Sequence, residues 1–162
     1  MDPGDHRLDV AEVTATDGRF SDVLQLAATV LNQDRYLLKQ IEHAQESHIV
    51  GAFDQEQCVG FLRFVIQELG RDAGCTTIVH GSAPLREGFV EAFGVEPSRR
   101  RSGIGTQLQT FAADYCRHAG CHQMRSRSPV TSTENYALKI RAGYTLHPSS
   151  ENDSYYFAKL LR

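Results

Sequence analysis

The feature that most constrains this chain is an apolar segment that leads into a basic, glycine-bearing turn and then a helix. Residues 89–95 (FVEAFGV) have the composition of a β-strand. Residues 96–102 (EPSRRRS) contain three consecutive arginines. From residue 103 to 119 the apolar side chains recur at helical spacing, and Gly103 and Gly105 stand at the start. A strand, a tight turn and a helix in this order indicate an α/β fold.

The start of that helix is suited to binding an anion. The first turn of a helix leaves backbone N–H groups without acceptors, and the helix dipole adds positive charge there. A pyrophosphate supplies the missing acceptors. Gly103 and Gly105 leave room for it, and arginine can bind phosphate through two hydrogen bonds. The segment therefore predicts a ligand that carries a diphosphate.

The charge distribution agrees with a small anion as ligand. The whole chain has a net charge of −3, which argues against general nucleic-acid binding. Residues 97–141 nevertheless hold eight Lys or Arg and only two acids. No Walker sequence is present, and Leu108 occupies the third glycine position of a dinucleotide fingerprint. A different nucleotide-binding domain remains an alternative.

The remaining sequence predicts a single α/β domain over residues 1–162, with a mixed central sheet flanked by helices. The expected strands are 8–14, 49–53, 58–66, 89–95, 123–127, 145–147 and 155–161. The expected helices are 20–32, 103–119 and 133–142, together with a helix that begins near Asp34 and contains Ile41. Residues 68–88 are expected to form a loop with a short strand at 76–79.

Composition also limits the setting of the protein. No apolar stretch reaches the roughly 20 residues that a membrane-spanning helix needs, and residues 1–10 lack the apolar core of a signal peptide. The four cysteines form no C-x-x-C pair and show no zinc-site spacing. We expect a cytoplasmic protein without a metal site or membrane partner.

Two motifs give the chain a family resemblance. Residues 100–105 (RRSGIG) resemble the R/Q-x-x-G-x-G/A signature of the GNAT superfamily of N-acetyltransferases. Val95 and Pro97 stand where that family has V-x-P, and residues 138–144 (LKIRAGY) resemble its second motif. The resemblance covers residues 8–161 by element order and 89–144 by motif.

The resemblance implies an enzyme that transfers an acetyl group from acetyl-CoA to a primary amine on a small molecule or peptide. It implies central strands that splay apart, backbone pairing of the pantetheine arm with the sheet, and an amide near Val95 that polarises the thioester. A non-catalytic acyl-CoA sensor is the alternative, and a homodimer through residues 155–161 is possible by analogy. The residues expected at the cofactor are Phe93, Gly94, Val95, Arg100, Arg101, Ser102, Gly103, Ile104, Gly105, Thr106, Asn135 and Lys139.

Acylation of an amine needs a base that takes up its proton. Glu91 lies four residues before Val95 and, by the period of two, on the same strand face. In many relatives an acidic residue in this position faces the acceptor, so Glu91 is the expected base. His80 is the rival.

The acid that protonates the leaving thiolate is harder to assign. Many relatives have a tyrosine four residues before the glycine of the second motif, but this chain has Lys139 before Gly143. Lys139 is expected either to contact the cofactor's phosphates or to have no role, and Tyr136, one turn earlier, is the candidate acid. The cofactor-contacting Asn of the family corresponds to Ser132 by distance or to Asn135 by type. Other candidate acids are Tyr144, Tyr155 and Tyr156.

Overall fold

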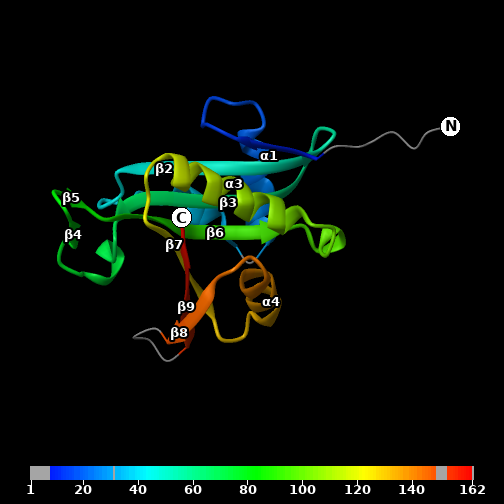
Figure 1. The fold of residues 1–162 in the computed structure, drawn as a ribbon. Helices are drawn as coiled ribbons and strands as arrows, with labels where there is room; N and C mark the ends of the chain where they lie inside the picture. The colour runs from blue at the N-terminus through cyan, green and yellow to red at the C-terminus, as the bar shows by residue number, and fades with distance from the viewer. Residues whose placement is uncertain (1–7, 31, 149–152, 162) are drawn as a thin grey trace.

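The computed structural model describes residues 8–30, 32–148 and 153–161 (Figure 1). The strands are β1 (Asp9–Glu12), β2 (Glu46–Asp54), β3 (Gln57–Glu68), β4 (Val79–His80), β5 (Ala83–Pro84), β6 (Arg86–Val95), β7 (Gln123–Pro129), β8 (Thr145–Pro148) and β9 (Ser154–Leu160). The helices are α1 (Phe20–Thr29), α2 (Asp34–Leu38), α3 (Ile104–His118) and α4 (Thr133–Arg141), with short 3-10 turns at Arg71–Ala73 and Pro97–Arg99.

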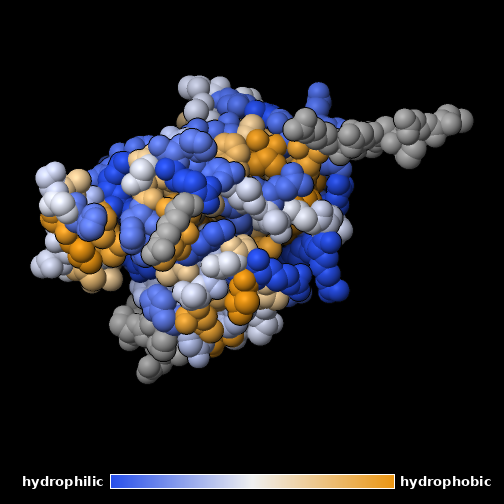
Figure 2. Space-filling model, viewed as in Figure 1, coloured by the Kyte–Doolittle hydropathy of each residue, from blue (hydrophilic) through white to orange (hydrophobic). Residues whose placement is uncertain are grey.

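The predicted elements are present, but several have different bounds: helix α1, expected over 20–32, ends at Thr29, and strand β1, expected over 8–14, ends at Glu12. Helix α2 ends at Leu38, so Ile41 lies outside it. Within residues 68–88, the short strand predicted at 76–79 is instead the hairpin of β4 and β5, which pairs Val79 with Pro84. Val79 in this hairpin and Ile78 just before it are apolar side chains that are 55% and 45% exposed, respectively. Figure 2 shows hydrophobic residues gathered over this hairpin.

Seven strands form one mixed sheet in the order β1-β2-β3-β6-β7-β9-β8. The β6–β7 pair is parallel, whereas the other neighbours in this sheet are antiparallel. Strand β9 pairs with β7 along its length and with β8 over residues 155–158. β9 is therefore an interior strand over residues 155–158, and the expectation of a homodimer through residues 155–161 stays a prediction.

The two faces of the sheet carry separate cores because side chains alternate along each strand. Leu62 on β3 packs on the face covered by α3, together with Leu108. Its neighbour Phe61 packs on the opposite face, which α1 covers with Val23 and Ala27. Strand β3 is therefore buried on both sides, and it fixes the position of its neighbour β6.

The predicted splay of the central strands is confirmed. Strands β6 and β7 pair from Glu87–Gln123 to Val90–Ser126, and then their pairing ends although both strands continue. On the other side of β6 the register shifts, because Phe64 pairs with Val90 and the preceding residue of β3 pairs with Ala92. Glu91 is the extra residue of this bulge. A bulge bends its strand, so β6 leaves β7 at this residue.

For residues 8–30, 32–148 and 153–161, no helix is long and apolar enough to cross a membrane. The same residues contain no group of three His, Cys, Asp or Glu side chains that could hold a metal ion.

Candidate active site

A groove of about 1910 Å³ opens where β6 and β7 diverge. Its walls include residues 33–43 around α2, residues 89–95 of β6, the turn and helix start between 99 and 106, residues 126–129 of β7, and residues 131–141, which contain α4. Figure 2 shows hydrophilic residues gathered where β6 ends and the turn into α3 begins. This volume exceeds the roughly 300–1,000 Å³ of an ordinary small-molecule pocket. The groove can therefore hold two reactants together.

The turn between β6 and α3 forms a cradle of backbone amides. Arg101 and Gly103 have positive φ angles of 63° and 85°, and α3 begins immediately afterwards at Ile104. A Cβ atom on Gly103 would meet no atom within 4 Å, so the approach to this turn is open. Among the described residues, no acceptor is bonded to the main-chain N–H groups from Arg101 to Thr106; Gln107 is the first to bond, to Gly103 O at 3.1 Å. The predicted cradle has the required geometry.

The three arginines of this turn have different partners. Arg99 forms an ion pair with Asp54, so its charge is already compensated. The guanidinium of Arg100 donates from Nε to Val95 O at 3.3 Å and lies 3.6 Å from exposed Glu134. Arg101 is exposed, lines the groove and has no ion-pair partner in the part of the chain that the structure describes. Arg100 and Arg101 are thus the charges available to an anion.

Gly105 is required by close packing. A Cβ atom there would lie 3.0 Å from Phe93 Cζ and 3.3 Å from Leu138 Cδ2. Helix α3 therefore approaches β6 and α4 closely at this residue, which keeps the cradle beside the open part of β6.

The open edge of β6 is the predicted site for the pantetheine arm. Hydrogen bonds to β3 alternate along this antiparallel ladder, and Glu96 N donates to Val59 O at 3.0 Å, so Phe93 and Val95 turn their main-chain groups to the side that β7 has left. The Gln33 side chain holds both groups of Phe93: Nε2 donates to Phe93 O at 3.0 Å, and Phe93 N donates to Oε1 at 3.0 Å. Sequence reasoning missed Gln33, since a glutamine at a helix start carries no distinctive pattern.

Glu91 lines the groove at the bulge. Burial raises the pKa of Glu91, and the nearby charges of Arg63 and Lys39 oppose this rise. Arg63 is buried and donates to Tyr36 O on α2, so Glu91 faces the α2 side of the sheet. The period of two, which puts Glu91 on the face of Val95, does not hold here because Glu91 is itself the extra residue of the bulge. The rival base His80 is exposed on β4 and does not line the groove.

Tyr136, the predicted acid, is turned away from the groove. Its hydroxyl donates to Pro129 O at 2.7 Å, and its ring packs 5.2 Å from that of Phe157. Tyr144 is also withdrawn, because it is buried and its hydroxyl donates to Gln109 Oε1 at 3.4 Å. Burial raises the pKa of Tyr144. Of the tyrosines considered from sequence, Tyr156 lines the groove.

Lys139 does not present its ammonium group to the phosphate cradle. Its side chain is only 1% exposed, Nζ donates to Gln109 Oε1 at 3.1 Å, and Nζ lies 4.4 Å from the centre of the Tyr144 ring. Burial lowers the pKa of Lys139 to about 7. The expectation that this lysine contacts phosphates is therefore corrected: it anchors α4 to α3.

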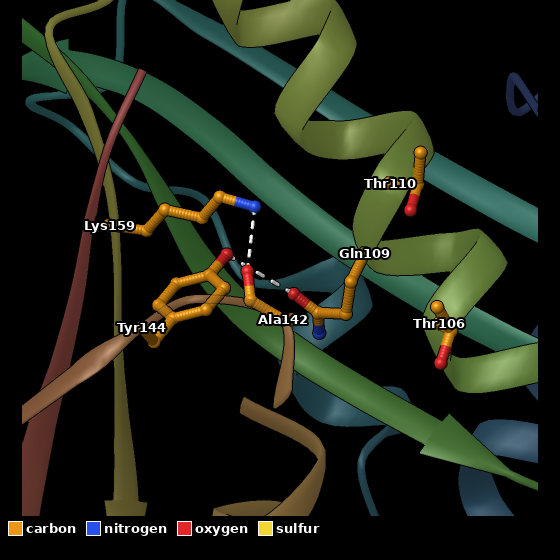
Figure 3. A pocket seen from close by; sticks show the side chains of 6 residues that line it. All are labelled: Thr106, Gln109, Thr110, Ala142, Tyr144 and Lys159. Carbon is orange, nitrogen blue, oxygen red and sulfur yellow. Dashed lines mark hydrogen bonds between the residues drawn. The ribbon is translucent and has the colours of Figure 1, made fainter. Parts of the chain in front are cut away.

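A pocket of only about 80 Å³ lies beside this anchor. Figure 3 shows Lys159 on one side of it, donating to Ala142 O at 2.7 Å, and the Tyr144–Gln109 hydrogen bond at its centre. Its volume suits a few water molecules and no larger ligand. The groove, rather than this pocket, is the candidate site.

Asn135 has a free hydrogen-bonding atom at the groove. Its Nδ2 donates to Ser128 Oγ at 2.6 Å, which fixes the amide, whereas Oδ1 is buried without a partner in the structure. Ser132 caps the start of α4 with its carbonyl, which accepts from Asn135 N at 3.1 Å. Of the two sequence candidates, Asn135 therefore offers a side-chain acceptor to a ligand.

A buried ionic network lies where β6 and β7 are still paired and supports the groove. Sequence reasoning missed this network. Glu87 is fully buried at the paired end of β6, and Arg125 on β7 bonds it from Nη2 at 2.8 Å and from Nε at 3.1 Å. Arg125 also pairs with Asp72 and lies 4.7 Å from the centre of the Tyr156 ring. The other donors to Glu87 are Gly70 N, Gln67 Nε2 and Gln123 Nε2. Burial alone would raise the pKa of Glu87, but Arg125 holds it below its usual value.

Splayed parallel strands, an amide cradle at a helix start and a carboxylate at the bulge together define an acyltransferase-like site for a diphosphate-bearing donor. The chain matches the Acetyltransferase (GNAT) family over residues 19–138 and belongs to this family. That membership places it among the acetyltransferases.

Individual relatives agree with the family. The chain is 33% identical over 57 residues to an aminoglycoside N(6')-acetyltransferase type 1 from Klebsiella aerogenes, a match that spans 35% of this chain and 38% of that relative. The fold is similar to a putative acyl-CoA N-acyltransferase from Klebsiella pneumoniae, with a TM-score of 0.70, 18% identity and coverage of 97% and 99% of the two chains. It is also similar to Arabidopsis thaliana NAA60 in complex with a bisubstrate analogue, with a TM-score of 0.69, 15% identity and coverage of 95% and 98%.

Proposed function

We propose that this protein transfers an acetyl group from acetyl-CoA to a primary amine of a small molecule or peptide. The observation that carries the proposal is the run of unbonded amides from Arg101 to Thr106 at the open start of α3. Donors without an acceptor are costly unless water or a ligand bonds them, and a diphosphate fits this row of N–H groups.

The residues of the groove fit the rest of such a donor. Arg100 and Arg101 supply positive charge beside the cradle, and the unbonded Oδ1 of Asn135 can accept from an amide N–H of the pantetheine arm. The edge of β6 that β7 has left carries the main-chain groups of Phe93, which Gln33 bonds, and the carbonyl of Val95, which accepts from Arg100, so a pantetheine arm would replace these contacts. The donor itself supplies an acetyl thioester, which a neutral amine can attack.

We assign the proton transfers to two groove residues. Glu91 takes the proton from the acceptor's ammonium group, directly or through water, since its raised pKa makes the carboxylate a better base. Tyr156 is assigned as the proton donor to the leaving thiolate, in place of Tyr136, because it lines the groove and its ring is held over Arg125. The nitrogen loses two protons as the ammonium group becomes an amide: Glu91 takes the first, the second is lost after attack and replaces the proton that Tyr156 gives to the leaving thiolate, and one proton is released to solvent overall.

The acceptor is assigned to the α2 side of the groove. Glu42 and Glu91 line the groove there, so two carboxylates can attract an amine, whereas Asp72 is already paired with Arg125. The aminoglycoside acetyltransferase is a relative whose name indicates an amine on a small molecule as the acceptor.

We further propose a cytoplasmic location, because the four cysteines form no disulfide and a reducing compartment suits them.

The test is thiol release from acetyl-CoA over a panel of primary amines, with Glu91→Gln and Glu56→Gln as matched variants. Glu56 is an exposed carboxylate in the β2–β3 turn, outside the groove. We expect Glu91→Gln to lower kcat at least about 100-fold while the Kd for acetyl-CoA stays within about 2-fold. Glu56→Gln should match the wild type. Tight binding of acetyl-CoA without release for any amine would favour a sensor, and tighter binding of ATP than of acetyl-CoA would refute the donor.

A further inference from the structure

The Gln33 side chain reproduces the contacts of a neighbouring strand. A residue in a β-ladder exchanges an N–H and a C=O with its neighbour, and β7 stops providing such contacts to β6 beyond Val90. The primary amide of Gln33 restores both for Phe93, with two hydrogen bonds of 3.0 Å. An amide of the pantetheine arm would need the same N–H and C=O, and each can serve one strand-like partner at a time.

Gln33 is also the residue from which α2 begins. Its carbonyl accepts from Tyr36 N at 2.9 Å and from Leu37 N at 3.3 Å, and its own N–H donates to Ala27 O at 2.8 Å. The bond from Arg63 to Tyr36 O ties α2 to β3 as well. Movement of the Gln33 side chain away from Phe93 therefore removes two hydrogen bonds that tie the start of α2 to β6.

We propose that Gln33 competes with the pantetheine arm of the acyl donor for the main-chain N–H and C=O of Phe93, so that donor binding releases the start of α2. This inference rests on the proposed function, since it takes acyl-CoA as the donor. Gln33 is a positioning residue: it sets the donor's affinity and couples the donor site to the wall of the acceptor site. Residues 33–43, which include α2, form that wall.

Competition predicts opposite effects on the two substrates. In Gln33→Ala the donor no longer displaces two neutral hydrogen bonds, so we expect its Kd to fall about 10-fold. The KM for the acceptor should rise at least about 3-fold, because α2 has lost one of its anchors. General damage to the groove would weaken the binding of donor and acceptor together. Tighter donor binding together with a higher KM for the acceptor therefore identifies Gln33 as a competitor of the donor.

The experiment is calorimetry with coenzyme A, which needs no turnover, on the wild type, Gln33→Ala, Gln33→Met and Gln25→Ala. Gln25 is an exposed glutamine on α1 outside the groove, and its variant should bind as the wild type does. The methionine side chain of Gln33→Met has a similar length but can form neither hydrogen bond to Phe93, so this variant also should bind more tightly, and it decides the question if Gln33→Ala does not fold. Hydrogen exchange at Tyr36 and Leu37 should speed up when coenzyme A is added to the wild type, and should be fast from the start in Gln33→Ala.

The outcomes separate the two proposals. Equal or weaker coenzyme A binding by the Gln33 variants, with normal binding by the wild type, overturns the competition and leaves the proposed function in place. Unchanged exchange at Tyr36 and Leu37 on addition of coenzyme A overturns the coupling. If no protein of the set binds coenzyme A, the donor assignment and this inference both fail.

Discussion

Lys139 is the residue whose replacement tests the packing around the site most directly. Its ammonium group is buried, and hydrogen-bonded to a neutral amide rather than to a carboxylate. Burial lowers the pKa of Lys139 from 10.5 to about 7 in the folded protein. The unfolded chain therefore binds one more proton than the folded chain between these two values, and stability must rise with pH over that interval.

The size of the effect follows from linkage. The slope is at most about 1.4 kcal/mol per pH unit, so the wild type should gain up to about 2–3 kcal/mol of unfolding free energy between about pH 7.5 and about pH 9.5. Lys139→Met keeps the length of the side chain and removes the ammonium group, so this contribution to the slope should disappear. Tyr144 can still donate to Gln109 in the variant.

Urea unfolding at several pH values measures both slopes. The thiol of Cys58, whose pKa burial raises to about 11, opposes the trend at high pH in both proteins, so the quantity to compare is the difference between the slopes. Lys39→Met removes an exposed ammonium group and is the control, with the slope of the wild type. Parallel lines for Lys139→Met and wild type would refute the reasoning and would mean that the ammonium group keeps its charge when folded.

Three further predictions concern the groove and its support. Gly105→Ala puts a Cβ atom 3.0 Å from Phe93 Cζ, so we expect a loss of about 1–2 kcal/mol in urea unfolding and weaker coenzyme A binding. Asn135→Ala removes the free Oδ1, so the Kd for coenzyme A measured by calorimetry should rise about 5-fold to 10-fold. Glu87→Gln leaves buried Arg125 without its main partner, and urea unfolding near neutral pH should show a loss of about 3 kcal/mol. Because Arg125 lowers the pKa of Glu87, this contribution is present above the unfolded value of 4.5 and is lost as the pH falls through the folded value.

Control variants and contradicting outcomes test each of these predictions. Gly18→Ala is the control for Gly105→Ala: its added Cβ atom has nothing within 4 Å, so steric crowding should not lower the free energy of unfolding. Tyr136→Phe removes a hydroxyl that donates to Pro129 O, and should change kcat less than about 2-fold if Tyr136 is not the acid. A large fall in kcat for Tyr136→Phe would restore the original assignment. Unchanged coenzyme A affinity in Asn135→Ala would remove that residue from the donor site, and unchanged stability in Glu87→Gln would contradict the buried ion pair.

Local sequence determined the elements and the phosphate cradle. The strand, basic turn and helix from residue 89 to 119 follow from composition and spacing, and the free amides at a helix start follow from backbone geometry alone. The helices 103–119 and 133–142 were predicted to within a residue at each end, because apolar periodicity and a terminal glycine mark them. These features depend on neighbours within a few positions, so sequence patterns record them.

Tertiary structure alone decided which side chains meet in the groove. Glu91 changed face because the bulge opposite Phe64 adds one residue to the strand, and no local pattern marks that shift. Tyr136 and Lys139 turned away because α4 packs them against Phe157 and Gln109 from distant parts of the chain. The partners of Gln33 and Glu87 are likewise far away in sequence. Long-range packing brings these groups together, and a pattern that spans a few residues holds no record of such contacts.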